Sequence, residues 1–177
     1  MTKLVKLDAA SMQSLGVRRQ EHVTHVDSRG SMGILFEHSF ETLDHSVTWK
    51  RSHSLAGVGR GLHFQTAEYP ITKIINLDVG DLIEFLYFPD GDSKQLFYFE
   101  YSASHGHSYV IPPHLAHGFV ALTDARFSYI TLGQYMPSRE RVYNFLPSAC
   151  ALLGLAEPTL SEKDRASAEL DLQGKSL

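Results

Sequence analysis

A lysine, a histidine and a tyrosine in the middle of the chain lie at strand positions whose side chains should point into the protein, where they could contact a ligand. Alternate side chains of a β-strand point to the same face. The same-face neighbours are Ile75, Leu77 and Val79 for Lys73, Gln65 for His63, and Phe127 and Thr131 for Tyr129. Together the three groups predict a barrel whose mouth binds a ligand. Each alone is more often a hydrogen-bonded side chain at a strand end.

Short strands in the region 47–132 must position these three side chains. The apolar or alternating segments are 73–79, 82–88, 96–101, 109–111, 117–122 and 127–132. Turn sequences such as Gly80-Asp81 and Pro89-Asp90-Gly91-Asp92 separate them. Many short strands with such turns are typical of an antiparallel sandwich or barrel. We therefore expect an all-β jelly roll, with helix only at 8–15 and after Ser161.

Length and composition indicate a single globular domain. The chain has 177 residues, of which 43% are hydrophobic, enough for one well-buried domain and too few for two. We expect one domain spanning 1–177, with a barrel core at about 45–135 and a helical segment at about 150–171.

Charge and hydropathy exclude several classes of protein. The net charge of −4 gives no basic surface for nucleic acid. No apolar run approaches the length of a membrane span, and the N-terminus has no hydrophobic signal segment. The single Cys150 excludes an internal disulfide framework and favours the cytoplasm. We therefore expect a cytoplasmic protein that binds neither nucleic acid nor membranes.

Two segments carry a recognisable pattern. Residues 57–65 read Gly-Val-Gly-Arg-Gly-Leu-His-Phe-Gln, and residues 111–119 read Ile-Pro-Pro-His-Leu-Ala-His-Gly-Phe. They resemble the Val-Leu-Arg-Gly-Leu-His-Phe/Tyr-Gln and Ile-Pro-Pro-x-x-Ala-His-Gly-Phe signatures of the dTDP-4-dehydrorhamnose 3,5-epimerase family. Weaker matches in the family's order are Asp27-Ser28-Arg29-Gly30, Lys73, Tyr129, Tyr135-Met136-Pro137, Glu140-Arg141 and Leu160-Ser161-Glu162-Lys163-Asp164.

The resemblance implies a cupin-type jelly-roll barrel of antiparallel strands that acts as a homodimer, without a cofactor or metal. Its substrate would be a nucleotide-diphosphate 4-keto-6-deoxy sugar, inverted at C3, C5 or both. His63 would be the general base, oriented by Asp164, and Tyr129 would be the general acid on the opposite face of the sugar. Lys73 would lie beside the C4 carbonyl oxygen.

The resemblance also implies a set of substrate-binding residues. Arg29 and Arg60 would hold the diphosphate, and Tyr135 would stack on the nucleotide base. The further positions expected to contact the substrate are Thr48, Lys50, Gln65, His117 and Lys163. Two guanidinium groups suit a diphosphate because each can donate a pair of parallel hydrogen bonds.

These residue types fit the inversion of a carbon beside a ketone. The reaction needs a base with a pKa near neutral to remove the proton, which suits His63. A carboxylate on the far ring nitrogen fixes the tautomer and stabilises the imidazolium that forms. A cation such as Lys73 stabilises the enolate oxygen, and losing one such contact typically costs roughly 3 kcal/mol.

Asp164 also has a structural interpretation. Ser161 stands three residues before it, a spacing like that of a capping box at a helix start. Capping and orientation of His63 can both hold only if the second oxygen of the aspartate is free. His117 could likewise be a packed strand histidine, and Arg60 a charge at the rim.

Departures from the family pattern are concentrated where the nucleotide would bind. Thr48 and Lys50 stand where the family usually has Gln and Asn. A base-contacting glutamate after Arg29-Gly30 is missing or displaced to Glu37, and Gly59 stands where leucine is common. We therefore expect the epimerase reaction, with a nucleotide other than thymidine or weak selection of the base.

Three other functions stay open. A metal-dependent cupin would have to use Gln65, Glu68 and His117 with His63, and a neutral amide is a poor ligand for transition metals. A non-catalytic sugar-nucleotide binding protein would not need an opposed acid and base. An epimerase of C3 or C5 alone, or a neighbouring ketosugar isomerase, differs only in the placement of the acid and the tilt of the substrate.

Overall fold

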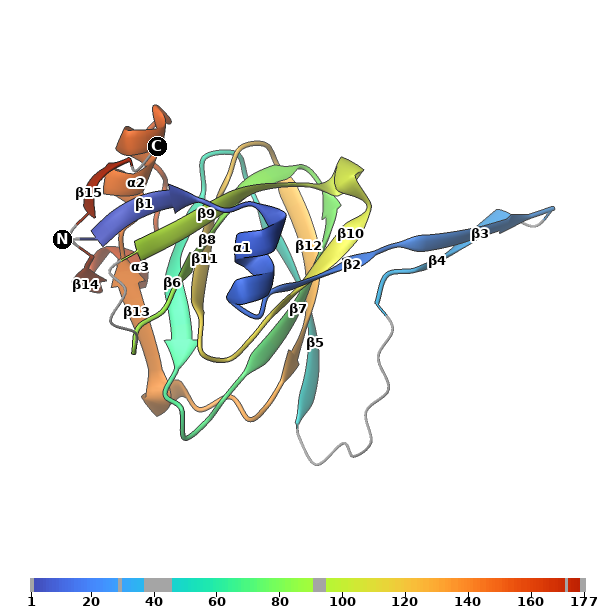
Figure 1. Ribbon diagram of the computed structural model, residues 1–177, viewed down its shortest axis with the longest axis horizontal. Helices are drawn as coiled ribbons and strands as arrows, with labels where there is room; N and C mark the ends of the chain where they lie inside the picture. The colour runs from blue at the N-terminus through green and yellow to red at the C-terminus, as the bar shows by residue number, and fades with distance from the viewer. Residues whose placement is uncertain (1, 29, 37–45, 91–94, 171, 176–177) are drawn as a thin grey trace.

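Two β-sheets that face each other form the body of the protein. The computed structural model describes residues 2–28, 30–36, 46–90, 95–170 and 172–175. Over these residues the larger sheet has the strand order β14-β13-β6-β11-β8-β9-β1-β15, and the smaller has the order β2-β10-β7-β12-β5. Figure 1 shows the two sheets curled around a common interior.

The elements of the described chain are short. The strands of the larger sheet are β1 (Thr2–Lys6), β6 (Gly59–Gln65), β8 (Asp81–Tyr87), β9 (Gln95–Ser102), β11 (Ala116–Ala121), β13 (Glu140–Asn144), β14 (Ala168–Glu169) and β15 (Leu172–Lys175). Those of the smaller sheet are β2 (Arg18–Glu21), β5 (Val47–Ser54), β7 (Thr72–Val79), β10 (His107–Ile111) and β12 (Ala125–Leu132). A separate hairpin consists of β3 (Val23–Asp27) and β4 (Gly30–Ile34). The helices are α1 (Ala9–Ser14), α2 (Leu146–Leu153) and α3 (Glu162–Arg165), with 3-10 turns at Ala103–His105 and Pro137–Arg139.

This all-β, cupin-type architecture confirms the fold class expected from the sequence. The sheets are mixed, however, and not purely antiparallel. β1 runs parallel to both β9 and β15, and β13 runs parallel to β14. These exceptions involve strands from the two ends of the chain, which join the sheet without the tight hairpin turn that makes neighbours antiparallel.

The helix predicted near the N-terminus is present, whereas the helical segment predicted near the C-terminus is not continuous. α1 forms where helix was expected, and the Asp8 side chain caps it by accepting the Ser11 N–H at 2.7 Å. The helical segment expected at 150–171 is broken instead. α2 ends at Gly154, whose φ of 72° stops the helix, and the chain returns to strands after α3. No helix in the described part of the chain is long and apolar enough to cross a membrane.

Alternation along the strands decides which side chains face the interior. Ile75 and Leu77 of β7 belong to the buried core between the sheets, and Lys73 and Tyr129 line the same interior. Val79 was expected on this face, but it is 41% exposed because it ends the strand.

The outer face of the larger sheet is covered as well. Ile83 and Phe85 of β8 pack with Leu146 and Cys150 of α2 in a second buried cluster. The opposite face of β8 contributes Leu82 to the first cluster. Burial on both faces explains why this strand is a nearly continuous apolar run.

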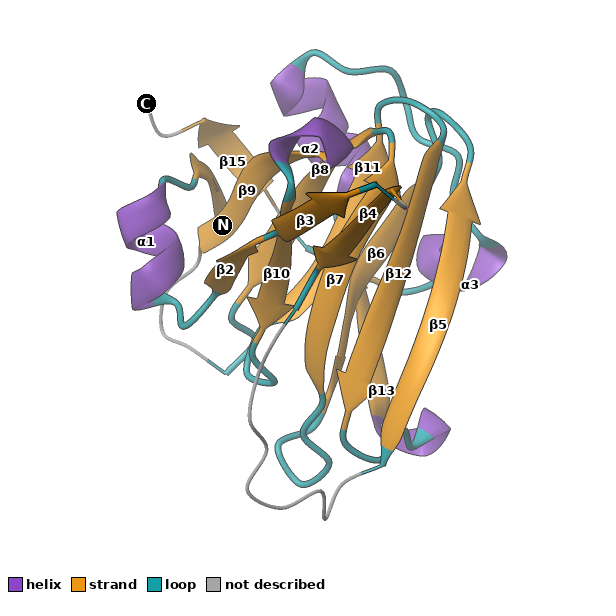
Figure 2. Ribbon diagram, turned by 90° about the vertical axis from the view of Figure 1, so that its right-hand side faces the viewer, coloured by secondary structure: helices purple, strands orange, loops and turns teal. Residues whose placement is uncertain are grey.

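The hairpin of β3 and β4 projects away from the barrel. It extends sideways in Figure 1 and points toward the viewer in Figure 2. Its apolar side chains Val23, Val26 and Met32 are 48%, 77% and 63% exposed. Within the described residues the hairpin pairs with neither of the two larger sheets. An isolated two-stranded hairpin is at best marginally stable in water.

Candidate active site

A cavity of about 200 Å³ lies between the two sheets. The predicted site residues that line it are Lys50, Arg60, His63, Gln65, Lys73, His117, Tyr129 and Tyr135. Asp164 and Lys163 are not part of the lining but are hydrogen-bonded to side chains that are. Thr48 is exposed on β5 and does not line the cavity. Arg29 and Glu37 lie outside the described residues.

A bulge in β6 turns Arg60 and His63 toward the same cavity. His63 pairs with His117 of β11, but two residues further along β11 the partner is Arg60. β6 therefore carries one extra residue at this point, which reverses the parity of its side chains. Simple alternation would have placed Arg60 and His63 on opposite faces of the sheet.

Two glycines allow the chains to approach closely at this bulge. A Cβ at Gly118 of β11 would lie 2.4 Å from the carbonyl oxygen of Gly61. A Cβ at Gly61 would lie 3.0 Å from Asp164 Oδ1. A side chain at either position would therefore push apart the strands and the helix that hold the site.

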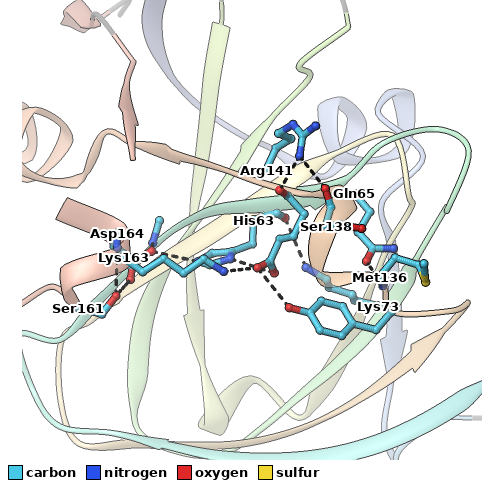
Figure 3. Close-up of polar contacts among 12 residues, drawn as sticks. His63, Gln65, Lys73, Met136, Ser138, Arg141, Ser161, Lys163 and Asp164 are labelled. Atoms are coloured by element: carbon cyan, nitrogen blue, oxygen red, sulfur yellow. Dashed lines mark hydrogen bonds and ion pairs between the residues drawn. The ribbon is translucent and has the colours of Figure 1, made fainter. Parts of the chain in front are cut away.

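Asp164 contacts the imidazole of His63 and is itself held by Ser161 (Figure 3). His63 Nε2 lies 3.0 Å from Asp164 Oδ1, which also accepts the Gly61 N–H at 3.1 Å. The other carboxylate oxygen, Oδ2, accepts from Ser161 Oγ at 2.6 Å. Ser161 Oγ in turn accepts the Asp164 N–H at 3.1 Å and caps α3. The two interactions that the sequence left open, the helix cap and the contact with His63, are both present.

Glu140 contacts the other nitrogen of the imidazole. Nδ1 of His63 lies 3.3 Å from Glu140 Oε1, and Oε2 contacts Lys163 and accepts from the Tyr135 hydroxyl at 3.3 Å. Burial lowers the pKa of His63, but the hydrogen bonds to Asp164 and Glu140 outweigh it and raise the pKa. The bond to His63 lowers the pKa of Glu140 to about 2. Burial raises the pKa of Asp164, yet its bonds to His63 and Ser161 bring it down to about 2.

A second pair of histidine and carboxylate lines the cavity beside Lys73. His117 Nδ1 lies 2.7 Å from Glu84 Oε1, and Glu84 exposes only 3% of its side chain. Burial raises the pKa of Glu84 well above its ordinary value and lowers the pKa of His117 well below it. Burial also lowers the pKa of Lys73 to about 8. The Lys73 ammonium donates to the backbone carbonyl of His63 at 3.4 Å.

Tyr129 lies on the wall that faces His63. It belongs to β12 of the smaller sheet, whereas His63 belongs to β6 of the larger one, and both line the cavity. Burial raises the pKa of Tyr129, so its phenol carries its proton at neutral pH. The Lys50 ammonium lies 5.7 Å from the centre of the Tyr129 ring and 5.4 Å from that of Tyr135.

Gln65 uses its amide to hold the backbone of a neighbouring loop. Its Nε2 donates to the carbonyls of Tyr69 and Gln134 at 2.8 and 3.0 Å. Its Oε1 accepts the Met136 N–H at 2.6 Å. Gln65 therefore fixes the loop that carries Tyr135, and its amide is already engaged by the protein.

Arg60 has no carboxylate partner within the described residues. Its guanidinium donates to Ser52 Oγ at 3.2 Å and lies 5.9 Å from the centre of the Phe119 ring. An exposed guanidinium at a cavity mouth without a counter-charge is suited to bind an anion.

The side chains that a metal site would require are bonded to other residues of the protein. No group of three or more His, Cys, Asp or Glu side chains in the described chain is placed to hold a metal ion. Glu68 forms an ion pair with Arg139 at 3.4 Å instead of reaching His63. The geometry of the site thus gives no support to the metal-dependent alternative.

Comparison with known proteins identifies the family. The profile of dTDP-4-dehydrorhamnose 3,5-epimerase matches residues 13–171. The chain belongs to the dTDP-4-dehydrorhamnose 3,5-epimerase family. It is therefore an isomerase of the sugar-epimerase class. No curated protein sequence matches the chain significantly.

Solved structures of epimerases resemble this one over most of their length. The dTDP-4-dehydrorhamnose 3,5-epimerase from Sulfolobus tokodaii is 25% identical, with a TM-score of 0.72 over 88% of this chain and 91% of that one. The rmlC epimerase of Mycobacterium tuberculosis is 26% identical, with a TM-score of 0.71 over 88% and 84%. A dTDP-6-deoxy-D-glucose-3,5-epimerase from Legionella pneumophila, in complex with dTDP-4-keto-L-rhamnose, is 25% identical, with a TM-score of 0.68 over 87% of each chain.

Two acidic residues of this epimerase's cavity were not among the predicted site residues. Glu84 has the interior parity of Leu82 and Leu86 in an otherwise apolar strand, and that interruption could have identified it. Glu140 was noted only as part of the segment Glu140-Arg141. No spacing in the sequence indicates that its carboxylate reaches His63, 77 residues away.

Proposed function

We propose that this epimerase inverts a nucleotide-diphosphate 4-keto-6-deoxy sugar at C3, C5 or both, by way of an enolate. The placement of His63 and Tyr129 on facing walls supports this most directly. A base and an acid so opposed can remove a proton from one face of a sugar ring and return one to the other. A cavity of about 200 Å³ is smaller than the roughly 300–1,000 Å³ of most ligand pockets, so it takes the sugar, with the nucleotide at the mouth.

Four side chains perform the chemistry in this proposal. His63 takes the proton from the carbon beside the ketone, and the C–H electron pair moves to the C4 oxygen. Asp164 stabilises the imidazolium that forms, and the Lys73 ammonium pairs with the enolate oxygen. Tyr129 then delivers its proton to the opposite face of the carbon. These steps use neither a cofactor nor a metal ion.

Two cations without a carboxylate partner in the described chain supply the binding site for the diphosphate. Arg60 and Lys50 both line the cavity, and their positive charges suit a dianion. Tyr135, which is 48% exposed, offers a ring on which a base can stack. The dTDP-sugar bound to the related Legionella enzyme supports a ligand of this class.

Hydrogen exchange into the sugar tests the reaction. The purified protein is incubated with a panel of nucleotide 4-keto-6-deoxy sugars in deuterated water, and deuterium is read at C3 and C5. We expect incorporation at one or both carbons, with inversion. If no member of the panel takes up deuterium at either carbon, the proposed activity is wrong.

A chelator control separates this reaction from that of a metal-dependent cupin. The same exchange is measured after dialysis against a chelator, with elemental analysis of the active protein. We expect the rate to be unchanged. Stoichiometric transition metal, with activity lost on its removal and restored on its return, would assign the chain to the metal-dependent alternative instead.

We also propose that the enzyme acts as a homodimer, with the β3–β4 hairpin at the interface. Val26 and Met32 are the most exposed apolar side chains of this hairpin, and Trp49 on the edge strand β5 is 75% exposed. Apolar surface of this kind is typical of an interface between proteins. Sedimentation velocity tests the assembly, and we expect a dimer that Val26→Asp dissociates. A monomer at micromolar concentration would contradict the proposal.

A further inference from the structure

The imidazole of His63 is hydrogen-bonded to a carboxylate at each of its nitrogens. Asp164 of α3 lies 3.0 Å from Nε2, and Glu140 of β13 lies 3.3 Å from Nδ1. An ionised carboxylate only accepts hydrogen bonds, so each of these nitrogens must carry a hydrogen. A ring with two N–H groups is an imidazolium, and an imidazolium cannot accept a proton. The base is therefore in an unreactive state in this arrangement.

The two carboxylates lie on different sides of the ring. Glu140 and His63 both line the cavity, whereas Asp164 lies outside the lining and also accepts the Gly61 N–H. Nδ1 is thus the nitrogen on the cavity side, where a substrate carbon has to approach. Glu140 covers this nitrogen, so its carboxylate has to move before a sugar can reach it.

The structure provides a place to which Glu140 can move. Its second oxygen, Oε2, already contacts the ammonium of Lys163 and the hydroxyl of Tyr135. The side chain of Lys163 is 61% exposed, so it can follow the carboxylate outward. A small rotation of Glu140 toward these two groups breaks only the contact with Nδ1.

We propose that Glu140 is a displaceable counter-ion that sets the protonation state of His63. In the empty site it holds the ring as an imidazolium. When substrate displaces the carboxylate toward Lys163, Nδ1 loses its proton and becomes the catalytic base. This role of Glu140 rests on the proposed epimerase function and deepens it, and Glu140 is a positioning residue because it acts through His63.

The proton balance of this cycle is closed. As substrate binds, the Nδ1–H bond breaks and the proton passes to Glu140 Oε1 and then to water. In the reaction the sugar C–H bond breaks, its proton forms a new bond to Nδ1, and its electron pair moves to the C4 oxygen. Tyr129 gives a proton to the carbon and regains one from water. The proton now on Nδ1 makes the ring an imidazolium again, and Glu140 returns to it when the product leaves. One proton therefore leaves through Glu140 as substrate binds, and one enters at Tyr129, for each inversion.

Four titratable groups from four elements surround His63. The two carboxylates, Glu140 and Asp164, favour its cationic form. Lys73 of β7 donates to its backbone carbonyl, and His117 of β11 is its partner on the neighbouring strand. Only Glu140 is both on the cavity side and tied to an exposed partner. Removing its charge should therefore change the titration of His63 while Asp164 keeps the ring in place.

An NMR titration of the empty protein tests this effect without any substrate. We compare the ring nitrogens of His63 in the wild type, in Glu140→Gln and in Glu68→Gln, a nearby exposed glutamate outside the cavity. We expect Glu140→Gln to lower the pKa of His63 by about one unit or more, the usual effect of losing a close opposite charge. The Glu68→Gln control should leave it unchanged.

The pH profile of deuterium exchange tests the catalytic consequence. We expect the acidic limb of kcat/KM to move to lower pH in Glu140→Gln, with a lower maximal rate because proton release is slower. Glu140→Asp, which keeps the charge on a shorter arm, should restore the position of the limb and serves as the second variant if Glu140→Gln folds poorly. A merely structural role would lower the rate without moving the limb.

The outcomes separate this inference from the function on which it rests. A pKa of His63 that is unchanged in Glu140→Gln overturns the counter-ion role, whatever the enzyme does. A limb that stays in place in active Glu140→Gln does the same. Absence of exchange in the wild type with every sugar contradicts the epimerase proposal, while the titration of the empty protein still decides whether Glu140 controls His63.

Discussion

The carboxylate of Glu84 lies 2.7 Å from Nδ1 of His117, and almost none of it reaches solvent. The pair joins neighbouring strands, since β8 and β11 are hydrogen-bonded to each other. Burial makes it costly for either side chain to lose its partner, because an unpaired polar group inside a protein keeps its full desolvation cost. The pair therefore stabilises the barrel in addition to lining the cavity.

Truncating Glu84 should destabilise the fold. We expect Glu84→Ala to lower the free energy of unfolding by about 1–3 kcal/mol, since His117 Nδ1 loses its partner. Glu84→Gln should cost less because an amide can still bond to the ring. Urea unfolding monitored by circular dichroism measures both. Glu100→Ala, on the exposed side of the adjacent strand β9, is the control and should change stability by no more than about 0.5 kcal/mol. Equal losses for Glu84→Ala and Glu100→Ala would refute the stabilising role.

Loss of the proton from the Lys73 ammonium should lower activity at high pH. Its lowered pKa of about 8 means that the cation is lost as pH rises through about 8, well below the ordinary range for lysine. We expect kcat/KM to fall above this pH because the enolate oxygen loses its counter-charge. Lys73→Met should lose roughly a hundredfold in rate, corresponding to roughly 3 kcal/mol, and show no such limb. A Lys73→Met enzyme with the wild-type rate would remove the lysine from the mechanism.

Substitutions of the base and of the acid should have different effects on exchange and inversion. We expect His63→Ala to abolish deuterium uptake at every carbon, because no enolate forms. Tyr129→Phe should retain some exchange but little inversion, because the proton then returns from the side of His63. Mass spectrometry and proton NMR of the recovered sugar distinguish exchange from inversion. Normal inversion by Tyr129→Phe would mean that another group is the acid.

Asp164 should make the protein sensitive to acid. Its pKa is lowered to about 2 from an ordinary 3.8, so its contribution to stability is fully present above about pH 4 and is lost as pH falls toward 2. We expect Asp164→Asn to be less stable than the wild type at neutral pH, with a difference that shrinks as pH falls through this window. Urea unfolding at a series of pH values measures it. A difference that is constant with pH would contradict the assignment.

Removing the hydroxyl of Ser161 should also lower the stability of the protein, because this hydroxyl contacts Asp164. Ser161→Ala loses both the cap of α3 and the bond to Asp164 Oδ2, and we expect it to cost about 1 kcal/mol of stability. Glu162→Gln, the exposed next residue, serves as the control in these measurements.

Lys50 should weaken the selection of the nucleotide base. It stands where the family usually has Asn, and it supplies a charge that attracts any diphosphate. We expect TDP, UDP, CDP and GDP to bind with affinities within about tenfold of one another, since each lost base contact is worth on the order of 1 kcal/mol. Lys50→Asn should weaken all four by calorimetry. A hundredfold preference of the wild type for TDP over the other three would show that other residues read the base.

Much of the fold could be predicted because it depends on local patterns. Alternation identified the interior faces of β7 and β12, and with them Lys73 and Tyr129. The nearly continuous apolar run of 82–88 predicted the strand β8, and the structure adds that this strand is buried on both faces. Strands from the chain ends were harder, because their partners are distant in sequence and no turn fixes their direction.

The parts of the site that could not be predicted depend on tertiary geometry. Arg60 and His63 line the same cavity only because the bulge in β6 reverses the alternation of its side chains. The bulge depends on the close approach of the backbones at Gly61 and Gly118, which no alternation pattern reveals. Glu140 reaches His63 through the pairing of β13 with β6, a contact between strands far apart in sequence. Sequence patterns report which face a side chain takes, but not which distant strand lies beside it.

The position of Asp164 along the chain also orders events during biosynthesis. Asp164 follows His63 by 101 residues and comes after every strand whose side chains line the cavity. Because a chain emerges from the ribosome N-terminus first, the walls of the cavity are synthesised before the carboxylate that holds the imidazole. A chain that stops before α3 would thus carry the residues that line the cavity but not the carboxylate that orients His63.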